Sequence, residues 1–297
     1  MTTQTAKGSI VLLAGPTASG KSRLAAEMAA ERGGIVINAD SMQVYRELRV
    51  LSARPAPEDE AAAPHRLYGH VGAVTRYSVG AWLADVAPLL AEAMRGGQPL
   101  IIVGGTGLYF KALTEGLASV PPIPAAVREA IAAEAASADS AALHARLAAL
   151  DPEDASQIRP SDRSRILRAL EVFATTGRSL ASWKGLAGAP PLVPPDKAER
   201  LVLMQETVEL HRRIAARAEA MVASGGIEEA RALGTLGLDP AIPAMKAIGV
   251  REFLAHLSGK LSLEEALTAI KTETRRYAKR QRTWIRNQMA DWRHVGG

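Results

Sequence analysis

The stretch GPTASGKS, at residues 15–22, constrains this chain more than any other. Two glycines separated by four residues and followed by Lys21 and Ser22 have the spacing of a phosphate-binding loop. The apolar run SIVLLAG (9–15) comes before it and RLAAEMAAER comes after it, so the loop joins a predicted strand to a predicted helix. Glycines let backbone N–H groups point inward, the helix N-terminus attracts anions, and Lys21 adds a full charge. We therefore expect the loop to bind a di- or triphosphate.

Apolar runs and helical segments alternate along the first 120 residues, and one more strand-like run follows near residue 200. The predicted strands are SIVLLAG (9–15), GIVINAD (34–40), HRLYGHV (65–71), PLIIVGG (99–105) and RLVLMQE (200–206). The predicted helices cover residues 21–32, 78–95, 209–224, 245–257 and 263–287. Strands rich in Val, Ile and Leu that alternate with helices are typical of parallel sheets buried on both faces. We therefore predict an α/β fold, a P-loop NTPase-like parallel sheet with helices on both faces.

Two proline clusters bracket a segment of different composition, PPIP at 121–124 and PPLVPP at 190–195. Between them the chain is rich in alanine and helical in pattern, with no strand candidate of more than a few residues. Proline-rich stretches make semi-rigid connectors. We therefore predict a small all-helical domain at 121–195, inserted into a core made of 1–120 and 196–297.

The composition narrows the class of protein. Of 297 residues, 47% are hydrophobic and 23% are charged, which is the balance of a soluble globular protein. No run has the length of a signal peptide core or of a membrane span, so we expect a cytoplasmic protein without a membrane partner. Cysteine is absent, which excludes disulfides and thiolate metal sites, and the six histidines lack metal-ligand spacing. The net charge of +5 favours a polyanionic partner.

Asp40 follows the second predicted strand, at the carboxyl end where open α/β sheets bind their ligands. Its carboxylate can support Mg²⁺ or orient a hydroxyl group, as in a small-molecule kinase. It can also accept the proton of an amine during group transfer from a diphosphate ester, or merely cap the following helix. Thr106 follows the fourth strand, where a phosphate-loop ATPase often has an acidic residue. Because Thr106 lacks that charge, the combination of Asp40 and Thr106 argues modestly against phosphoryl transfer.

Five motifs together resemble one enzyme family. GPTASGKS, INADSMQVYREL, PLIIVGGTGLYFKALTEGL, RILRALEVFATTGRSL and TRRYAKRQRTWIRNQ occur in the order and spacing of bacterial tRNA dimethylallyltransferases, also called tRNA isopentenyltransferases. The resemblance runs from about residue 9 to 288. It implies that the loop holds the diphosphate of dimethylallyl diphosphate, with Mg²⁺. It also implies transfer of the dimethylallyl group to the N6 amine of the adenosine 3′ of the anticodon (tRNA position 37), in tRNAs that read codons beginning with U.

The resemblance assigns roles to residues of this chain. Asp40 is implied as the general base and Thr106 as the residue that orients it or the amine, while Ser22 would ligate Mg²⁺. The implied diphosphate-binding residues are Gly15, Pro16, Thr17, Ala18, Ser19, Gly20, Lys21, Ser22 and Arg217. For Arg217, a solvated face of a basic helix is an equally good interpretation from the residues alone.

A basic segment near the C-terminus predicts the RNA contact. Seven Lys or Arg and one Glu lie between Lys271 and Arg286, and four of the basic residues share one helical face at spacings of 4, 3 and 4. Such a run is usually a solvated surface, but the resemblance places it where relatives contact tRNA. The implied tRNA-binding residues are Asp40, Ser41, Met42, Gln43, Ser164, Arg165, Ile166, Leu167, Arg168, Lys246, Ala247, Ile248, Gly249, Val250, Arg251, Lys279, Arg280, Arg282 and Arg286.

This chain departs from its relatives at three of these positions. Relatives often have Gln at the position of Ser164, Arg at that of Lys246 and an aromatic residue at that of Val250. A shorter side chain reaches less far, and Lys gives a point charge where Arg gives a bidentate fork.

We expect a monomer that transfers a prenyl group to a tRNA anticodon stem-loop. Three other functions are alternatives to this prediction. GPTASGKS alone would suit a small-molecule kinase that consumes ATP. Prenylation of free adenine nucleotides would need the same loop but no RNA-facing segments. A non-catalytic phosphate-loop module would bind tRNA without turnover.

Overall fold

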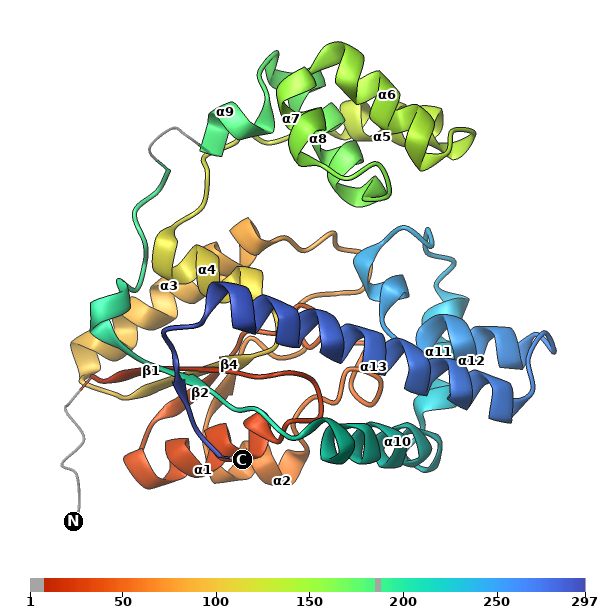
Figure 1. The fold of residues 1–297 in the computed structure, drawn as a ribbon. Coiled ribbons are helices and arrows are strands. Elements are labelled where there is room, and N and C mark those ends of the chain that lie inside the picture. The colour runs from red at the N-terminus through yellow and green to blue at the C-terminus, as the bar shows by residue number, and fades with distance from the viewer. Residues whose placement is uncertain (1–7, 185–187, 297) are drawn as a thin grey trace. The chain divides into compact units, whose positions relative to one another are not determined.

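The computed structural model describes residues 8–184 and 188–296, which divide into two compact units (Figure 1). The larger unit combines Met1–Thr114 with Leu192–Gly297, and the smaller unit is Glu115–Pro191. None of the helices in these described ranges combines the length and apolar character needed to cross a membrane.

A parallel sheet forms the centre of the larger unit, with strand order β3-β2-β4-β1-β5-β6. Its strands are β1 (Ile10–Ala14), β2 (Ile35–Asn38), β3 (His65–Arg66), β4 (Leu100–Gly104), β5 (Ala198–Val202) and β6 (Arg293–His294). All paired neighbours run parallel, and β1 is paired on both sides, with β4 and with β5. The predicted α/β fold is confirmed.

The strand bounds differ from the sequence-based prediction at three places. HRLYGHV forms only the two-residue strand β3, because Leu67 turns the chain with a φ of 63°. The last predicted strand begins earlier, at Ala198, and ends at Val202. The edge strand β6 was not predicted, because two exposed residues carry no apolar pattern.

Helices cover both faces of this sheet and form the rest of the larger unit. They are α1 (Lys21–Arg32), α2 (Pro57–Ala62), α3 (Val79–Gly96), α4 (Gly107–Glu115), α10 (Thr207–Ala223), α11 (Gly226–Thr235), α12 (Val250–Leu257) and α13 (Leu263–Gln288), with 3₁₀ turns η1 (Pro195–Lys197) and η2 (Pro243–Lys246). The helix predicted at 245–257 begins only at Val250, because Gly249 before it has a φ of 104°.

Three large hydrophobic cores, and a small one between α10 and α13, hold the described part of the larger unit together. One face of the sheet packs against α3, α4 and the end of α13, around Trp82 and Phe110. The other face packs against α1, around Ala25 and Met28. Figure 1 shows α3, α4 and α13 on one side of the sheet and α1 and α2 on the other. A third core joins α10 to α13 with the segment 42–51.

Helices make up most of the described residues of the smaller unit. Its helices are α5 (Ala125–Ala136), α6 (Ser140–Leu150), α7 (Pro152–Gln157), α8 (Arg163–Thr176) and α9 (Leu180–Lys184). They bury their own core around Leu147, Ile166 and Leu170. The two ends of the unit meet in a single antiparallel bridge between Leu117 and Ala189.

Candidate active site at the phosphate loop

The loop at residues 15–22 turns from β1 into α1 as the sequence predicts. Gly20, directly before the helix, has a φ of 94°, and Ala18 also adopts a left-handed φ of 63°. A Cβ on Gly15 would lie 2.8 Å from the Leu203 carbonyl oxygen and 2.8 Å from Ser19 Oγ, so glycine is required there. The loop thus directs its backbone and the N-terminus of α1 toward one place, which suits an anion.

Lys21 supplies a partly desolvated cation at the base of this loop. Its side chain is buried, and Nζ donates a hydrogen bond of 3.3 Å to the Pro16 carbonyl. Burial lowers the pKa of Lys21 to about 8, with the charge of Asp40 opposing this shift and that of Arg217 adding to it. The ammonium group therefore stays largely protonated at neutral pH.

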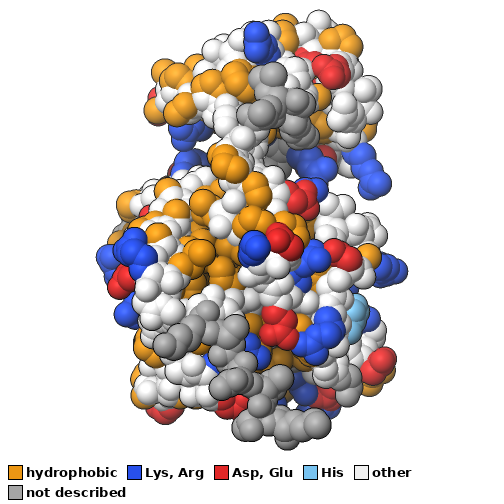
Figure 2. Space-filling model, turned by 90° about the vertical axis from the view of Figure 1, so that its left-hand side faces the viewer, with side chains coloured by type: hydrophobic (Ala, Val, Ile, Leu, Met, Phe, Trp, Pro, Cys, Tyr) orange, Lys and Arg blue, Asp and Glu red, His pale blue; other side chains and the backbone are white. Residues whose placement is uncertain are grey.

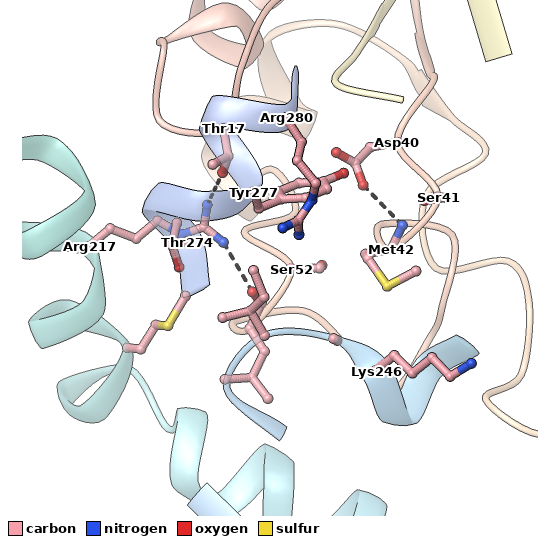
Figure 3. Close-up of a pocket in the computed structure, with 14 residues that line it drawn as sticks. Thr17, Asp40, Ser41, Met42, Ser52, Arg217, Lys246, Thr274, Tyr277 and Arg280 are labelled. Atoms are coloured by element: carbon pink, nitrogen blue, oxygen red, sulfur yellow. Dashed lines mark hydrogen bonds between the residues drawn. The ribbon is translucent and has the colours of Figure 1, made fainter. Parts of the chain in front are cut away.

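Arg217 of α10 points into the site (Figure 3). Its Nη1 donates to Thr17 Oγ1 at 2.7 Å and its Nη2 donates to the Leu51 carbonyl at 3.0 Å. Its Nε is buried and has no hydrogen-bond partner in the described part of the chain. Burial lowers the pKa of Arg217, while the Asp40 charge raises it. The interpretation of Arg217 as a solvated helix face is wrong.

Gln281 of α13 is a site residue that the sequence analysis missed. Its Oε1 accepts a hydrogen bond from Thr17 N at 2.8 Å, and its Nε2 donates to the Gly105 carbonyl at 3.0 Å. Gln281 therefore connects the phosphate loop with the end of β4. The available signal was its position, because it follows Tyr277 by four residues and lies on the buried stripe of an amphipathic helix.

Asp40 and Thr106 lie at the same edge of the sheet because β2 and β4 are neighbouring parallel strands. Thr106 Oγ1 accepts a hydrogen bond from Ser41 N at 3.0 Å, and Thr106 N donates to the Ala39 carbonyl at 3.3 Å. Asp40 Oδ1 accepts from Met42 N at 3.0 Å. Asp40 thus does cap the turn that follows it, with one of its two oxygens. Thr106 contacts the residue after Asp40 and does not bond to its carboxylate.

A cavity of about 240 Å³ lies beside Asp40 (Figure 3). Its polar lining includes Thr17, Asp40, Ser41, Arg217 and Arg280. Its apolar lining includes Leu51, Met221, Ala247 and Ile248. Tyr277 also lines it, and burial together with the Asp40 charge raises the pKa of its hydroxyl. The cavity therefore offers cations, a carboxylate and an apolar wall to one ligand.

The basic residues of α13 fall into two groups. Lys279 and Arg286 are exposed, whereas Arg282 is half-buried and donates to Thr207 Oγ1 at 2.7 Å. The Arg280 guanidinium lies 5.6 Å from the centre of the Tyr277 ring and reaches the cavity. Helix α13 therefore presents cations to solvent and to the site at once.

Net charge alone would not have located this surface. Figure 2 shows one face of the molecule, where Lys and Arg side chains are interspersed with Asp and Glu around an area of hydrophobic side chains on the larger unit. Because this face carries both signs of charge, the overall excess of positive charge does not by itself locate an RNA-binding surface.

Several residues within the predicted RNA-binding stretches are buried. Ile166 and Val250 are both 0% exposed and Ala247 is 4% exposed, since they belong to hydrophobic cores. Gly249 is buried at the N-terminus of α12. Gln43 is buried, and its Nε2 donates to the carbonyls of Ser52 and Ala53. Apart from Ala247, which lines the cavity beside Asp40, these residues are packed inside the protein.

The other residues of these stretches are accessible. Ser164, Arg165 and Arg168 are exposed on α8 of the smaller unit, with Leu167 half-buried beside them. Lys246 and Arg251 are exposed next to α12, and Ile248 is half-buried between them. In both stretches the side chains alternate between core and surface, as expected for helices and turns.

No group of three His, Cys, Asp or Glu side chains that could hold a metal occurs in the described ranges. Mg²⁺ commonly takes only one or two protein ligands and completes its shell with substrate phosphates and water. The hydroxyl of Ser22, in the first turn of α1, and the carboxylate of Asp40 are oxygen ligands of the kind that Mg²⁺ prefers. The residues present therefore fit Mg²⁺ held mainly by a diphosphate.

The parallel sheet and the loop between β1 and α1 define an α/β protein of the P-loop class. Within that class, a model of the IPP transferase family matches residues 43–288. The chain belongs to this family.

Sequence relatives and solved structures agree with this assignment. A tRNA dimethylallyltransferase of Nitrobacter hamburgensis is 54% identical over 283 residues, which cover 95% of this chain and 89% of the relative. One of Methylobacterium nodulans is 53% identical over 287 residues, covering 96% and 94%. The structure of a full-length tRNA isopentenylpyrophosphate transferase from Bacillus halodurans superimposes with a TM-score of 0.69 at 33% identity, covering 97% and 90%. A eukaryotic dimethylallyltransferase acting on tRNA gives a TM-score of 0.79 at 26% identity, covering 97% and 73%.

Proposed function

We infer that this chain is a tRNA dimethylallyltransferase. It transfers the dimethylallyl group of dimethylallyl diphosphate to the N6 amine of the adenosine at tRNA position 37, next to the anticodon, and releases diphosphate. The observation that supports this most strongly is the 54% identity with an enzyme of that name along 95% of the chain. A small-molecule kinase is not favoured, because its relatives would not carry that name and it would need no basic helix.

The phosphate loop binds the leaving group in this proposal. As the bond between the allylic carbon and the diphosphate oxygen breaks, both bonding electrons move to that oxygen. The loop N–H groups, Lys21 and Arg217 stabilise the developing negative charge, and they do so in a partly desolvated site where charges interact more strongly than in water. Mg²⁺, held by Ser22 and the diphosphate oxygens, would supply additional charge stabilisation when bound.

Asp40 accepts a proton from the attacking amine. The adenine N6 forms a bond to the allylic carbon, and one N6 proton moves to the carboxylate. Because Met42 N occupies Asp40 Oδ1, Oδ2 is the oxygen available to the amine. Base catalysis of this type contributes about 10²–10⁴ in rate. Thr106 holds Ser41 and so fixes the turn that carries Asp40.

The tRNA anticodon stem-loop binds to the exposed basic residues of α13. A base in a single-stranded loop costs little to unstack, so adenosine 37 can leave the loop and enter the cavity at Asp40. Arg280 and Tyr277 line that cavity and can contact the base. We place this enzyme, as a monomer, in the cytoplasm with its tRNA substrate.

One assay tests the proposed function. The protein is incubated with Mg²⁺, dimethylallyl diphosphate labelled in the prenyl group, and tRNA that lacks the modification. We expect label in the tRNA and, after digestion, in N6-dimethylallyladenosine. Parallel reactions with free AMP and with ATP plus tRNA test the alternatives. Label in AMP but not in tRNA, or ATP hydrolysis without prenyl transfer, would reject the proposal.

A further inference from the structure

The turn formed by residues 49–53 supplies a wall of the cavity and a ligand for Arg217. Leu51 and Ser52 line the cavity, and the Leu51 carbonyl accepts the 3.0 Å hydrogen bond from Arg217 Nη2. The other terminal nitrogen of Arg217 donates to Thr17 in the phosphate loop. The direction of the guanidinium therefore depends on where this turn holds the Leu51 carbonyl.

Glu229 of α11 holds the turn from its N–H side. Its Oε2 accepts hydrogen bonds from Arg49 N and Val50 N, both at 2.8 Å, and its Oε1 accepts one from Leu51 N at 2.9 Å. One carboxylate thus binds three successive backbone N–H groups that are about 180 residues away in sequence. Hydrogen bonds to an ionised acceptor are about twice as strong as neutral ones.

Two further contacts leave this turn little freedom. Gln43 Nε2 donates to the Ser52 and Ala53 carbonyls at 3.1 and 2.8 Å. The Leu51 side chain is buried, and a Cβ on Gly249 would lie 2.8 Å from its Cδ2. The backbone of the turn is therefore fixed by a carboxylate on its N–H groups and an amide on its carbonyls.

Both terminal nitrogens of Arg217 donate to neutral acceptors, Thr17 Oγ1 and the Leu51 carbonyl, and none of its described hydrogen bonds goes to Asp40. Burial lowers the pKa of Arg217, and the negative charge of Asp40 opposes this shift, as expected for opposite charges that attract each other. If the turn moved, the Arg217 guanidinium would lose the Leu51 carbonyl as an acceptor, and an ion pair with the Asp40 carboxylate would become more favourable. Such a pair would remove a cation from the diphosphate and occupy the base.

We propose that Glu229 is a positioning residue for the diphosphate end of the donor. By binding the three N–H groups it fixes the Leu51 carbonyl, which orients the Arg217 guanidinium toward the phosphate loop. This inference rests on the proposed function, in which Arg217 binds diphosphate. Glu229 itself contacts neither donor nor tRNA.

The test compares Glu229→Gln with Glu228→Gln. Glutamine has the shape of glutamate but only one acceptor oxygen, so its NH₂ group faces an N–H that it cannot bind. We expect Glu229→Gln to raise the donor KM and the dissociation constant of Mg²⁺–diphosphate about tenfold, as expected for the loss of one charge-assisted hydrogen bond. The KM for tRNA should stay the same. Glu228 is the exposed neighbour in the same first turn of α11, so its replacement removes the same charge near the helix N-terminus but leaves the turn intact. We expect wild-type constants for it.

A double variant separates this role from a general loss of structure. If Glu229 acts through Arg217, then Glu229→Gln should have almost no further effect on diphosphate affinity in an Arg217→Ala background. Effects that multiply, or a Glu229→Gln variant that binds diphosphate as Glu228→Gln does, would overturn the inference. If the wild type neither binds diphosphate nor transfers the prenyl group, the proposed function is wrong. The activity of the wild type therefore separates a failure of the proposed function from a failure of the Glu229 inference.

Discussion

The pKa of Lys21 predicts how donor affinity changes with pH. Burial lowers this pKa to about 8, and only the protonated ammonium attracts the diphosphate. In the free enzyme, the protonated fraction falls from about nine-tenths at pH 7 to about one-tenth at pH 9. Because the diphosphate itself is fully charged at the higher pH, we expect its affinity to fall by about tenfold between pH 7 and pH 9.

The number of protons taken up or released on binding provides a second test of the same prediction. Bound diphosphate stabilises the ammonium and raises the pKa of Lys21, so binding at pH 8 should take up about half a proton. Titration calorimetry of Mg²⁺–diphosphate in two buffers of different ionisation enthalpy measures this number. A Lys21→Arg variant stays charged up to pH 9 and should lose the pH dependence. Equal wild-type affinity at pH 7 and pH 9, or proton release on binding, would refute the reasoning.

Lys21 has the opposite effect on folding. Its pKa in the folded protein, about 8, is below the ordinary lysine value of 10.5. The unfolded chain therefore binds more protons between these two values, and the contribution of Lys21 to the free energy of unfolding increases as the pH rises through this range. Donor affinity and this contribution to stability should thus change in opposite directions above pH 8.

Three further predictions concern other residues. Asp40→Asn keeps an oxygen for the Met42 N–H, so tRNA affinity should persist while kcat falls at least about a hundredfold; equal losses in single-turnover rate and in affinity would make Asp40 a binding residue. Arg286→Ala should lower the slope of log affinity for tRNA against log salt by about one, and an unchanged slope in filter binding would return Arg286 to a solvated face. Burial raises the pKa of Asp151, so its charge costs stability as the pH rises through that pKa. Asp151→Asn should therefore raise the melting temperature at pH 7 but much less at pH 4, and a loss of stability at pH 7 would contradict this.

The parts of the fold that depend on local chemistry were predictable from the sequence. Helix α1 begins and ends where predicted, because Gly20 and Gly33 both adopt left-handed φ values at its ends. The buried strands of the sheet were predictable because they are continuous runs of Val, Ile and Leu. The placement of Asp40 beside the phosphate loop followed from the same sheet, since parallel strands end at one edge.

The contacts that orient the site were not predictable in this way. Gln281 bonds to Thr17 across 264 residues, and Glu229 bonds to the turn at 49–51 across about 180. Spacing can place such a residue on the buried face of a helix, but it does not identify the partner. Each of these contacts depends on how α11 and α13 pack. The predicted RNA-binding stretches include buried side chains for a related reason. A contiguous stretch of helix always includes inward residues, and Ile166 is one of them.

The structure of the enzyme with an unreactive donor, in which sulfur replaces the bridging oxygen of dimethylallyl diphosphate, tests the central claim most directly. The claim is that the loop at residues 15–22 holds a leaving diphosphate while Asp40 faces the carbon that is attacked. We predict both phosphates within hydrogen-bonding distance of the loop N–H groups, Lys21 and Arg217, with the prenyl group in the cavity beside Asp40. A diphosphate bound away from this loop, or a prenyl group directed away from Asp40, would contradict the account.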